Sequence, residues 1–212
     1  MRFILPVLGL AAALMLPASA YAIPMTFVAN LSSANEIPPT ASTATGFASV
    51  VLDPTAETMQ VNVTFSGLTT PATAAHIHCC LPSPFFPMNV GVATTVPAFP
   101  GFPVPPNISP PGVTSGDYHS AVLSLLDAGT YNPVFVAMFP GGIPQAAVAL
   151  IAGIENDETY LNIHTMMFPN GEIRGFLVAA PEPASLVLLG SALLGFGLIR
   201  RRRNGSSSSL NE

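Results

Sequence analysis

The sequence predicts an all-β domain, an antiparallel β-sandwich with one short helix and a long proline-rich loop. Three observations lead to this prediction. Short runs of β-branched and aromatic residues recur through the centre of the chain, turn-forming residues separate these runs, and a helical pattern occurs in one segment of the centre alone.

Eight runs are candidate strands because β-forming residues alternate or cluster in them. They are Met25–Leu31, Thr45–Leu52, Thr58–Phe65, Ala72–Cys80, Tyr118–Leu125, Val134–Met138, Tyr160–Thr165 and Glu172–Val178. The pair Asn170-Gly171 between the last two runs predicts a hairpin. The candidate helix is Pro144–Ile154, where a proline stands near the start and alanine, leucine and isoleucine repeat.

The segment from Cys79 to Gly116 predicts a loop of a particular kind. It contains ten prolines and no charged residue, yet phenylalanine and valine side chains are scattered through it. Disordered segments are normally polar and charged, so we expect this one to pack over the domain. There it would either line a binding site or form a rigid surface excursion.

The N-terminal end carries a targeting signal. Residues 1–22 combine Arg2, an apolar run from Phe3 to Leu16 and small residues in the order Ala-x-Ala, which predicts a secretory signal peptide and export by the Sec machinery. The folded domain then spans residues 23–180. It holds nine acidic side chains and one base, Arg174, a net charge of −8 that argues against nucleic-acid binding.

The C-terminal end, residues 181–203, carries a second signal. Its parts follow in the order Pro181, Glu182, Pro183, an apolar run from Ala184 to Ile199, and then Arg200, Arg201, Arg202 and Arg203. The apolar run predicts a short transmembrane helix, and the arginines place the tail in the cytoplasm and the domain in the periplasm. A polar tail, residues 204–212, follows.

This arrangement resembles the PEP-CTERM sorting signal of bacteria that produce exopolysaccharide. The resemblance implies that an exosortase-type processing enzyme recognises the PEP motif. It also implies transient anchoring in the inner membrane, delivery to the cell surface or the extracellular matrix, and exopolysaccharide as a partner. Residues 204–212 depart from the pattern, because such tails usually end soon after the arginines, and a plain C-terminal anchor is the alternative.

Three blocks of the domain resemble the chordin-type, or CHRD, domain. They read FVANLSSANEIPPTASTATGFASVVLD, FSGLTTPATAAHIH and YLNIHTMMFPNGEIRGFL. The resemblance covers about residues 25–178 and implies a β-sandwich, so the expected fold is immunoglobulin-like or superoxide-dismutase-like. The sequence departs from the family after AHIH, where HIHCC and the proline-rich segment replace a short loop. That departure puts in doubt any ligand role of the loop.

Histidines supply a candidate site for copper or zinc. Side chains alternate along a strand, so His76, His78 and Cys80 share one face. His164 on another strand, or His119, could supply a further ligand. The H-x-H strand is also similar to the copper-binding strand of Cu/Zn superoxide dismutases, although the zinc loop and the arginine-bearing channel of that family have no obvious counterpart here. The alternative is that the histidines are structural and hydrogen-bond across strands.

Two further groups have structural interpretations. Cys79 and Cys80 are the only cysteines of the chain, and in an oxidising compartment a disulfide between them is our first expectation. Cys80 as a soft metal ligand and an intermolecular bridge are the alternatives. We expect Arg174 to form a structural ion-pair network with Glu172 and Glu36.

No motif of nucleophilic catalysis, nucleotide binding or metalloprotease activity occurs, so we do not expect an enzyme. Two function hypotheses follow. The first is an exported, non-enzymatic cell-surface or exopolysaccharide-matrix protein with one CHRD-like domain, sorted and processed through its tail. The second is a secreted β-sandwich protein that binds copper or zinc, with or without redox activity.

Overall fold

The structure is a computed structural model that describes residues 23–82, 88–104, 112–181, 191–194 and 196. Nine strands lie in these residues: β1 Met25–Ser32, β2 Thr45–Asp53, β3 Thr58–Ser66, β4 Ala72–His78, β5 Gly116–His119, β6 Leu123–Ser124, β7 Tyr160–Thr165, β8 Ile173–Phe176 and β9 Val178–Ala179. The helices are α1 Pro133–Ala137 and α2 Ile143–Glu155, with short 3-10 turns at Ser33–Asn35 and Ala128–Thr130.

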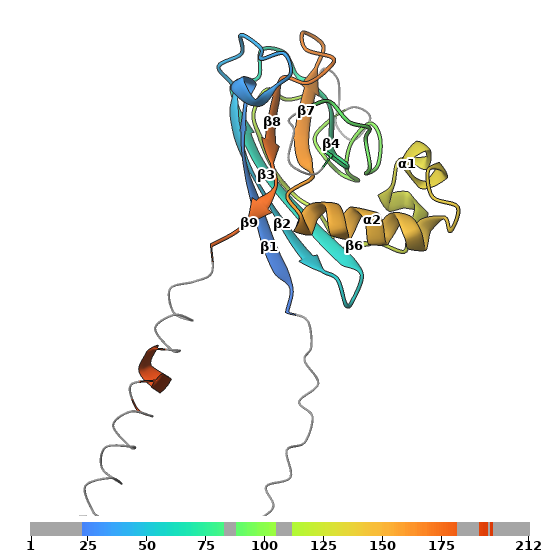
Figure 1. Ribbon diagram of the computed structural model, residues 1–212. Coiled ribbons are helices and arrows are strands. Elements are labelled where there is room, and N and C mark those ends of the chain that lie inside the picture. Colours follow the sequence, from blue (N-terminus) through green and yellow to red (C-terminus); the bar gives the residue numbers. More distant parts are fainter. Residues whose placement is uncertain (1–22, 83–87, 105–111, 182–190, 195, 197–212) are drawn as a thin grey trace, which may run out of the picture.

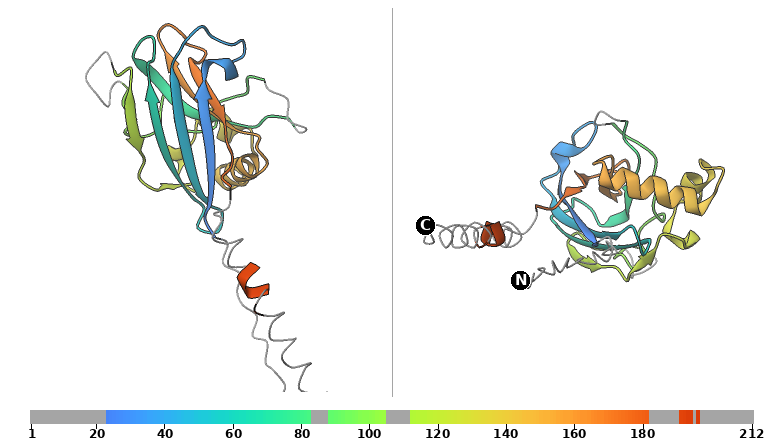
Figure 2. Two further views of the ribbon diagram at one scale, coloured as in Figure 1. Left: turned by 90° about the vertical axis from the view of Figure 1, so that its left-hand side faces the viewer. Right: turned by 60° about the horizontal axis from the view of Figure 1, so that its bottom comes forward.

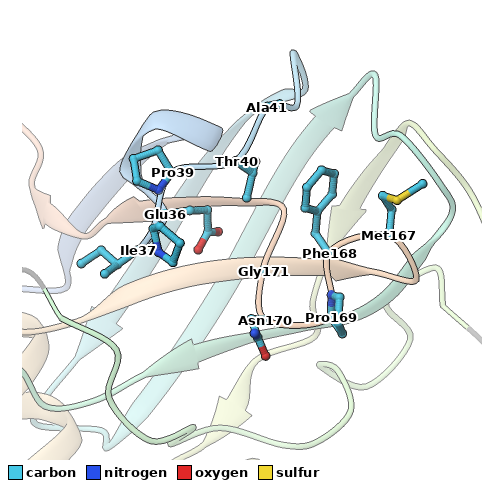
Figure 3. Close-up of a pocket in the computed structure, with 11 residues that line it drawn as sticks. Glu36, Ile37, Pro39, Thr40, Ala41, Met167, Phe168, Pro169, Asn170 and Gly171 are labelled. Carbon is cyan, nitrogen blue, oxygen red and sulfur yellow. The ribbon is translucent and has the colours of Figure 1, made fainter.

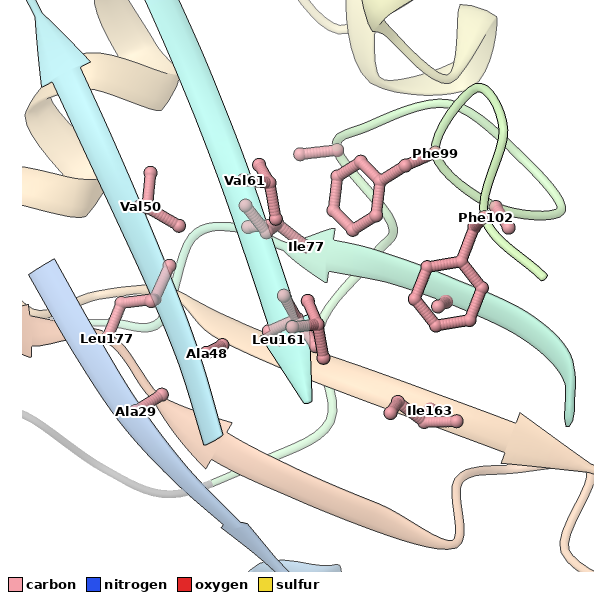
Figure 4. Close-up of a cluster of buried hydrophobic side chains, with 14 of the residues drawn as sticks. Ala29, Ala48, Val50, Val61, Ile77, Phe99, Phe102, Leu161, Ile163 and Leu177 are labelled. Carbon is pink, nitrogen blue, oxygen red and sulfur yellow. The ribbon is translucent and has the colours of Figure 1, made fainter. Parts of the chain in front are cut away.

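The nine strands form one antiparallel sheet that curls into a half-barrel (Figures 1 and 2). The strand order is β4-β7-β8-β1-β2-β3-β5, with β6 paired to β3 and β9 paired to β1. The curl brings β4 and β7 to face β2 and β3 across an apolar interior (Figure 4). The predicted all-β, sandwich-like fold is thereby confirmed.

The long strands β1, β2 and β3 follow the alternation of their sequence. In β2 the side chains of Ala48, Val50 and Leu52 are fully buried, and the residues between them are partly exposed. In β3 Val61 and Val63 are buried in the same way. Successive side chains of a strand point to opposite faces, so a run of this pattern has one apolar face to bury against the core.

Strand β7 differs because both of its faces are buried. Leu161 and Ile163 point into the core. Tyr160, Asn162 and His164 point to the other face, which loops cover rather than solvent. This second, polar face of β7 and of its neighbours β4 and β8 carries the candidate site described below.

The proline-rich segment covers the edge strand β4. Ala93 N donates to Ile77 O at 2.9 Å, and Phe99 N donates to Ala75 O at 3.1 Å, so residues 88–104 satisfy backbone groups that the edge of the sheet leaves free. Phe99 and Phe102 are fully buried in the core (Figure 4). The expectation that this segment packs over the domain is confirmed for residues 88–104, while 83–87 and 105–111 lie outside the described residues.

Three of the predicted strands are wrong in their type or continuity, and one of them, Glu172–Val178, divides at Leu177 into β8 and β9. The run Val134–Met138 is not a strand but lies mostly in helix α1, because Asn132 caps the helix by accepting a hydrogen bond from Val134 N and Pro133 stands in the first turn. The run Tyr118–Leu125 is interrupted. The hydroxyl of Ser120 accepts a hydrogen bond from Val61 N at 2.8 Å, and the strand divides there into β5 and β6.

The predicted helix is confirmed as α2, which lies across the open side of the half-barrel (Figure 1). Its apolar face buries Ala146, Ala147, Leu150 and Ile154. The two ends of the domain meet near β9, where Val178 pairs with Val28 and Ala180 N donates to Thr26 O at 2.8 Å.

The predicted signal peptide and most of the sorting tail lie outside the described residues, which include Pro181, residues 191–194 and residue 196 of that tail. In the part of the chain that the structure describes, we find no helix with the length and apolar character that crossing a membrane requires.

Candidate metal centre

Three imidazoles converge on the polar face of the sheet. His76 and His78 lie on β4, and His164 lies on β7; one ring nitrogen of each lies within 4.8 Å of those of the other two. The ring centroids of His76 and His164 are 4.6 Å apart, and those of His76 and His78 are 4.8 Å apart. An ion bound by all three would lie about 2 Å from each nitrogen, so the rings would have to draw slightly closer together as it binds.

The register of two strands produces this convergence. In the β4–β7 pair, His164 lies opposite Ala74 and Asn162 lies opposite His76. His164 is therefore the diagonal neighbour of His76 on the same face, a distance that long side chains bridge. His78 follows His76 by two residues and shares that face.

Each imidazole is held through its Nδ1 atom by a main-chain carbonyl. His76 Nδ1 lies 3.0 Å from Pro97 O, His78 Nδ1 lies 2.7 Å from Val90 O, and His164 Nδ1 lies 3.0 Å from Pro169 O. A carbonyl oxygen can only accept, so each Nδ1 must carry the proton. The neutral ring then presents a lone pair at Nε2, which is the tautomer that a metal ligand needs.

The three Nε2 atoms are buried and have no hydrogen-bond partner among the described residues. His76, His78 and His164 are between 5% and 8% exposed, so water does not reach the rings freely. Buried polar atoms are nearly always paired, and three unpaired acceptors in one place are unusual unless a ligand joins them.

Burial also keeps the three rings neutral. Desolvation, reinforced by the neighbouring histidines, lowers the pKa of His76 to about 3. Desolvation likewise lowers the pKa of His78 to about 4 and lowers the pKa of His164. Their lone pairs are therefore available at neutral pH without the loss of a proton.

A layer of side chains backs the cluster. The ring of Tyr160 stacks on His78, with centroids 4.5 Å apart, and the guanidinium of Arg174 lies 4.7 Å from the centroid of the same tyrosine. Val90 N donates to the Tyr160 hydroxyl at 3.2 Å, and Val90 O is the acceptor that holds His78. Tyr160 therefore supports both the plane of His78 and its carbonyl partner.

A buried ion pair lies beside this layer. Arg174 Nε is 3.5 Å from Glu36 Oε2, and their side chains are 0% and 3% exposed. Burial raises the pKa of Glu36 to about 7 against the opposing effects of Arg174 and of a hydrogen bond from Asn162. Atoms of all three residues (Glu36 Oε1, Asn162 Oδ1 and Arg174 Nη2) are buried without a partner among the described residues.

A cavity of about 390 Å³ opens next to Glu36 (Figure 3). Two loops form it, the one that follows β1 and the one between β7 and β8. Its lining residues are Glu36, Ile37, Pro38, Pro39, Thr40, Ala41, Met167, Phe168, Pro169, Asn170 and Gly171. Figure 3 shows the carboxyl group of Glu36 pointing toward Gly171.

The other residues that the sequence proposed for the metal lie apart from the three-histidine cluster. His119 is on β5 at the opposite end of the strand order, exposed, with Nδ1 2.8 Å from Asn62 Oδ1 and Nε2 3.3 Å from Asp117 Oδ2. Cys80 follows the end of β4, and its sulfur faces Ala149 O of helix α2 at 3.7 Å. Neither residue belongs to the group of converging ligand atoms.

Cys79 and Cys80 are joined to each other by a disulfide. The expected network around Arg174 needs a correction, because its partner is Glu36 and not Glu172. Glu172 instead accepts hydrogen bonds from Ser42 Oγ, Thr69 N and Thr165 Oγ1. These groups satisfy the hydrogen-bonding capacity of the Glu172 carboxylate without a contribution from the guanidinium of Arg174.

The sequence reasoning did not include Asn162, Tyr160 and the three carbonyl groups in the site. Asn162 and Tyr160 could have been found, because they alternate with His164 along one strand and must share its face. The carbonyls of Val90, Pro97 and Pro169 had no such signal. Their positions depend on how two loops fold back over the sheet.

Two family models match the chain. A model described as CHRD domain matches residues 27–177, and a model described as PEP-CTERM protein-sorting motif matches residues 179–203. The second match indicates export to the cell envelope or surface and processing by exosortase-type machinery. Comparison with curated proteins and comparison with solved structures give no match.

Proposed function

The chain belongs to the CHRD domain family, and from this premise we propose that it is an exported protein of the cell surface or extracellular matrix that binds rather than catalyses. The observation that carries the proposal is the order of the two matches. One CHRD domain fills residues 27–177, and the sorting motif begins two residues later, at 179. This order gives one folded domain followed directly by a sorting signal, and the signal peptide expected from the sequence would precede both.

The structure is compatible with that order. Strand β9, which ends at Ala179, pairs with β1, so the last strand before the sorting motif lies beside the first strand of the domain. Processing at Pro181 or beyond would remove chain that follows the last strand. The domain with its net charge of −8 would keep its whole core.

Expression in a bacterium that has an exosortase, and in the same strain without it, tests this proposal. We expect the tagged chain to be shortened and to reach the surface or medium in the first strain, and to stay longer and membrane-associated in the second. The variant P181A/E182A/P183A should behave in the first strain as the natural chain does in the second. An uncut chain in the cytoplasm of both strains would contradict the proposal.

A second candidate function, binding of copper or zinc, is favoured by the three-histidine cluster. The observation that supports it is the set of three buried Nε2 atoms without a partner in the described part of the chain. Neutral imidazole is a preferred ligand of both ions. The carbonyls that hold each Nδ1 atom are the outer partners that such ligands normally have.

Metal analysis of residues 23–180, purified without a histidine tag, tests this second candidate. We expect one equivalent of Cu²⁺ or Zn²⁺ per chain and a rise in Tm on loading, because an ion that binds the folded state alone stabilises it. The variant H164Q should lose the metal. The matched control H119Q removes a histidine outside the cluster and should keep it. A natural domain whose Tm responds to neither ion would end the metal hypothesis.

A further inference from the structure

We infer that the three-histidine site keeps one coordination position open, and that the Oδ1 atom of Asn162 accepts a hydrogen bond from the water or hydroxide that fills it. This inference rests on the metal-binding candidate function and adds what that function leaves unspecified, namely the class of exogenous ligand and the residue that receives it.

The number of protein ligands supports an open position. The chain has four histidines and two cysteines, all of them in the described residues. Three histidines converge, both cysteines are consumed by their disulfide, and among the described residues no carboxylate joins the group. Closed structural zinc sites have four protein ligands, whereas sites with three keep a position for water or substrate.

Asn162 lies where a ligand at this position would be received. It is the cross-strand partner of His76, and it precedes His164 by two residues on the same face of β7. Asn162 is 2% exposed, and its Oδ1 atom has no partner within the described chain. A metal-bound water is a strong hydrogen-bond donor, so it would satisfy this buried acceptor.

A cavity lies close to Asn162, because Gly171, one of its lining residues, lies against the Asn162 side chain. Asn162 and Glu36 both lie against Gly171, and Glu36 and Gly171 border the cavity of about 390 Å³. Pro169 and Gly171 line the same cavity, and Pro169 O holds His164. The cavity and the metal site therefore have Pro169 in common.

The charges select the kind of ligand. A divalent ion held by three neutral imidazoles keeps its double positive charge, and the guanidinium of Arg174 stands opposite Asn162 on β8. Glu36 offsets one positive charge. The site therefore favours a small metal ligand that binds through one atom, either water or an anion such as hydroxide, fluoride or azide. Its burial excludes larger groups.

The test uses the Cu²⁺-loaded domain with fluoride and azide as probes. We expect fluoride to split the copper EPR signal, azide to produce a saturable charge-transfer band with one-to-one stoichiometry, and water protons to relax faster than with the metal-free domain. In N162A, azide should bind about tenfold more tightly while copper stays bound, because the water that azide displaces has lost its acceptor. The matched control N62A, on β3 away from the cluster, should bind azide as the natural domain does.

The outcomes separate two failures. In the first, bound copper shows nitrogen hyperfine splitting but does not respond to fluoride or azide. The site would then be closed, with Asn162 or another group as fourth ligand, and this inference alone would be overturned. A domain that binds no copper would overturn the metal-binding candidate and this inference with it. Equal azide affinity in N162A and N62A would remove the role of Asn162.

Discussion

The imidazole of His78 lies nearly parallel to the phenol ring of Tyr160, with an interplanar angle of 10° and centroids 4.5 Å apart. The same tyrosine meets Val90 through its hydroxyl, and Val90 O holds Nδ1 of His78. Tyr160 thus fixes the plane of the His78 ring by stacking on it. Through its hydrogen bond with Val90 it also fixes the carbonyl that determines the tautomer of His78.

This relationship predicts how Tyr160 affects metal binding. The variant Y160F keeps the stacked ring and loses the hydroxyl, and it should weaken Cu²⁺ affinity by roughly tenfold, because outer partners of ligands typically contribute 10–100-fold. Y160L loses both features and should weaken it further. Competition titration with a chelator measures both values. Equal affinity in all three proteins would mean that the ring only fills space.

The pH dependence of stability follows from the buried titratable groups. An unfolded histidine has a pKa near 6.5, but the pKa of His76 is about 3 and that of His78 about 4 in the folded domain. Between pH 6.5 and 4 the unfolded chain therefore binds more protons, and the free energy of unfolding falls as the pH is lowered. Glu36 acts in the opposite sense, because its raised pKa of about 7 lets the folded state bind a proton first.

Three histidines outweigh one glutamate, so we expect the metal-free domain to be less stable at pH 5 than at pH 7.5. Urea unfolding at both pH values measures the difference. The variant E36Q removes the opposing group and should make the loss larger. A free energy of unfolding that rises toward pH 5 would show that the histidines are accessible to protons in the folded state.

Substitution of Arg174 should lower the unfolding free energy by a large amount. Its side chain is fully buried, pairs with Glu36 and donates from Nη1 to Asn89 Oδ1 at 3.0 Å. R174M leaves the Glu36 carboxylate buried without its partner, which should cost about 3–5 kcal/mol of unfolding free energy. The double variant R174M/E36Q removes both charges and should recover part of that loss. Urea unfolding of the two variants provides the comparison.

Replacing Gly153 of helix α2 with alanine should lower the unfolding free energy, although helix propensity alone predicts an increase. Alanine is normally favoured over glycine in a helix interior by about 1 kcal/mol. A Cβ atom at position 153 would lie 2.6 Å from Cys79 Sγ and 2.9 Å from Cys80 Sγ, so the helix must move away from the disulfide. We expect G153A to lower the unfolding free energy by about 1–3 kcal/mol.

The control for this variant is G91A in the proline-rich segment, where a Cβ atom meets nothing within 4 Å. It should leave the unfolding free energy nearly unchanged. If G153A were as stable as the natural domain, the contact between α2 and the disulfide would have to be loose.

Residue order along the chain was enough to predict the elements and their faces. The alternation of Leu161 and Ile163 with polar residues predicts β7, and the two-residue spacing of His76 and His78 predicts that they share a face. The same local information failed for Val134–Met138, because a capping asparagine and a proline outweigh the β-forming residues that follow them.

Strand neighbours were not predictable in the same way. His119 remained an alternative to His164 along the chain, and the sheet excludes it by placing β7 next to β4 and β5 at its other end. Both Glu36 and Glu172 were expected beside Arg174, and the structure confirms Glu36 alone, because the turn after β1 folds over β8. Local order determines which way each side chain points. Which strands become neighbours depends on burying the apolar faces of the whole sheet at once, so local order alone does not determine which distant residues meet.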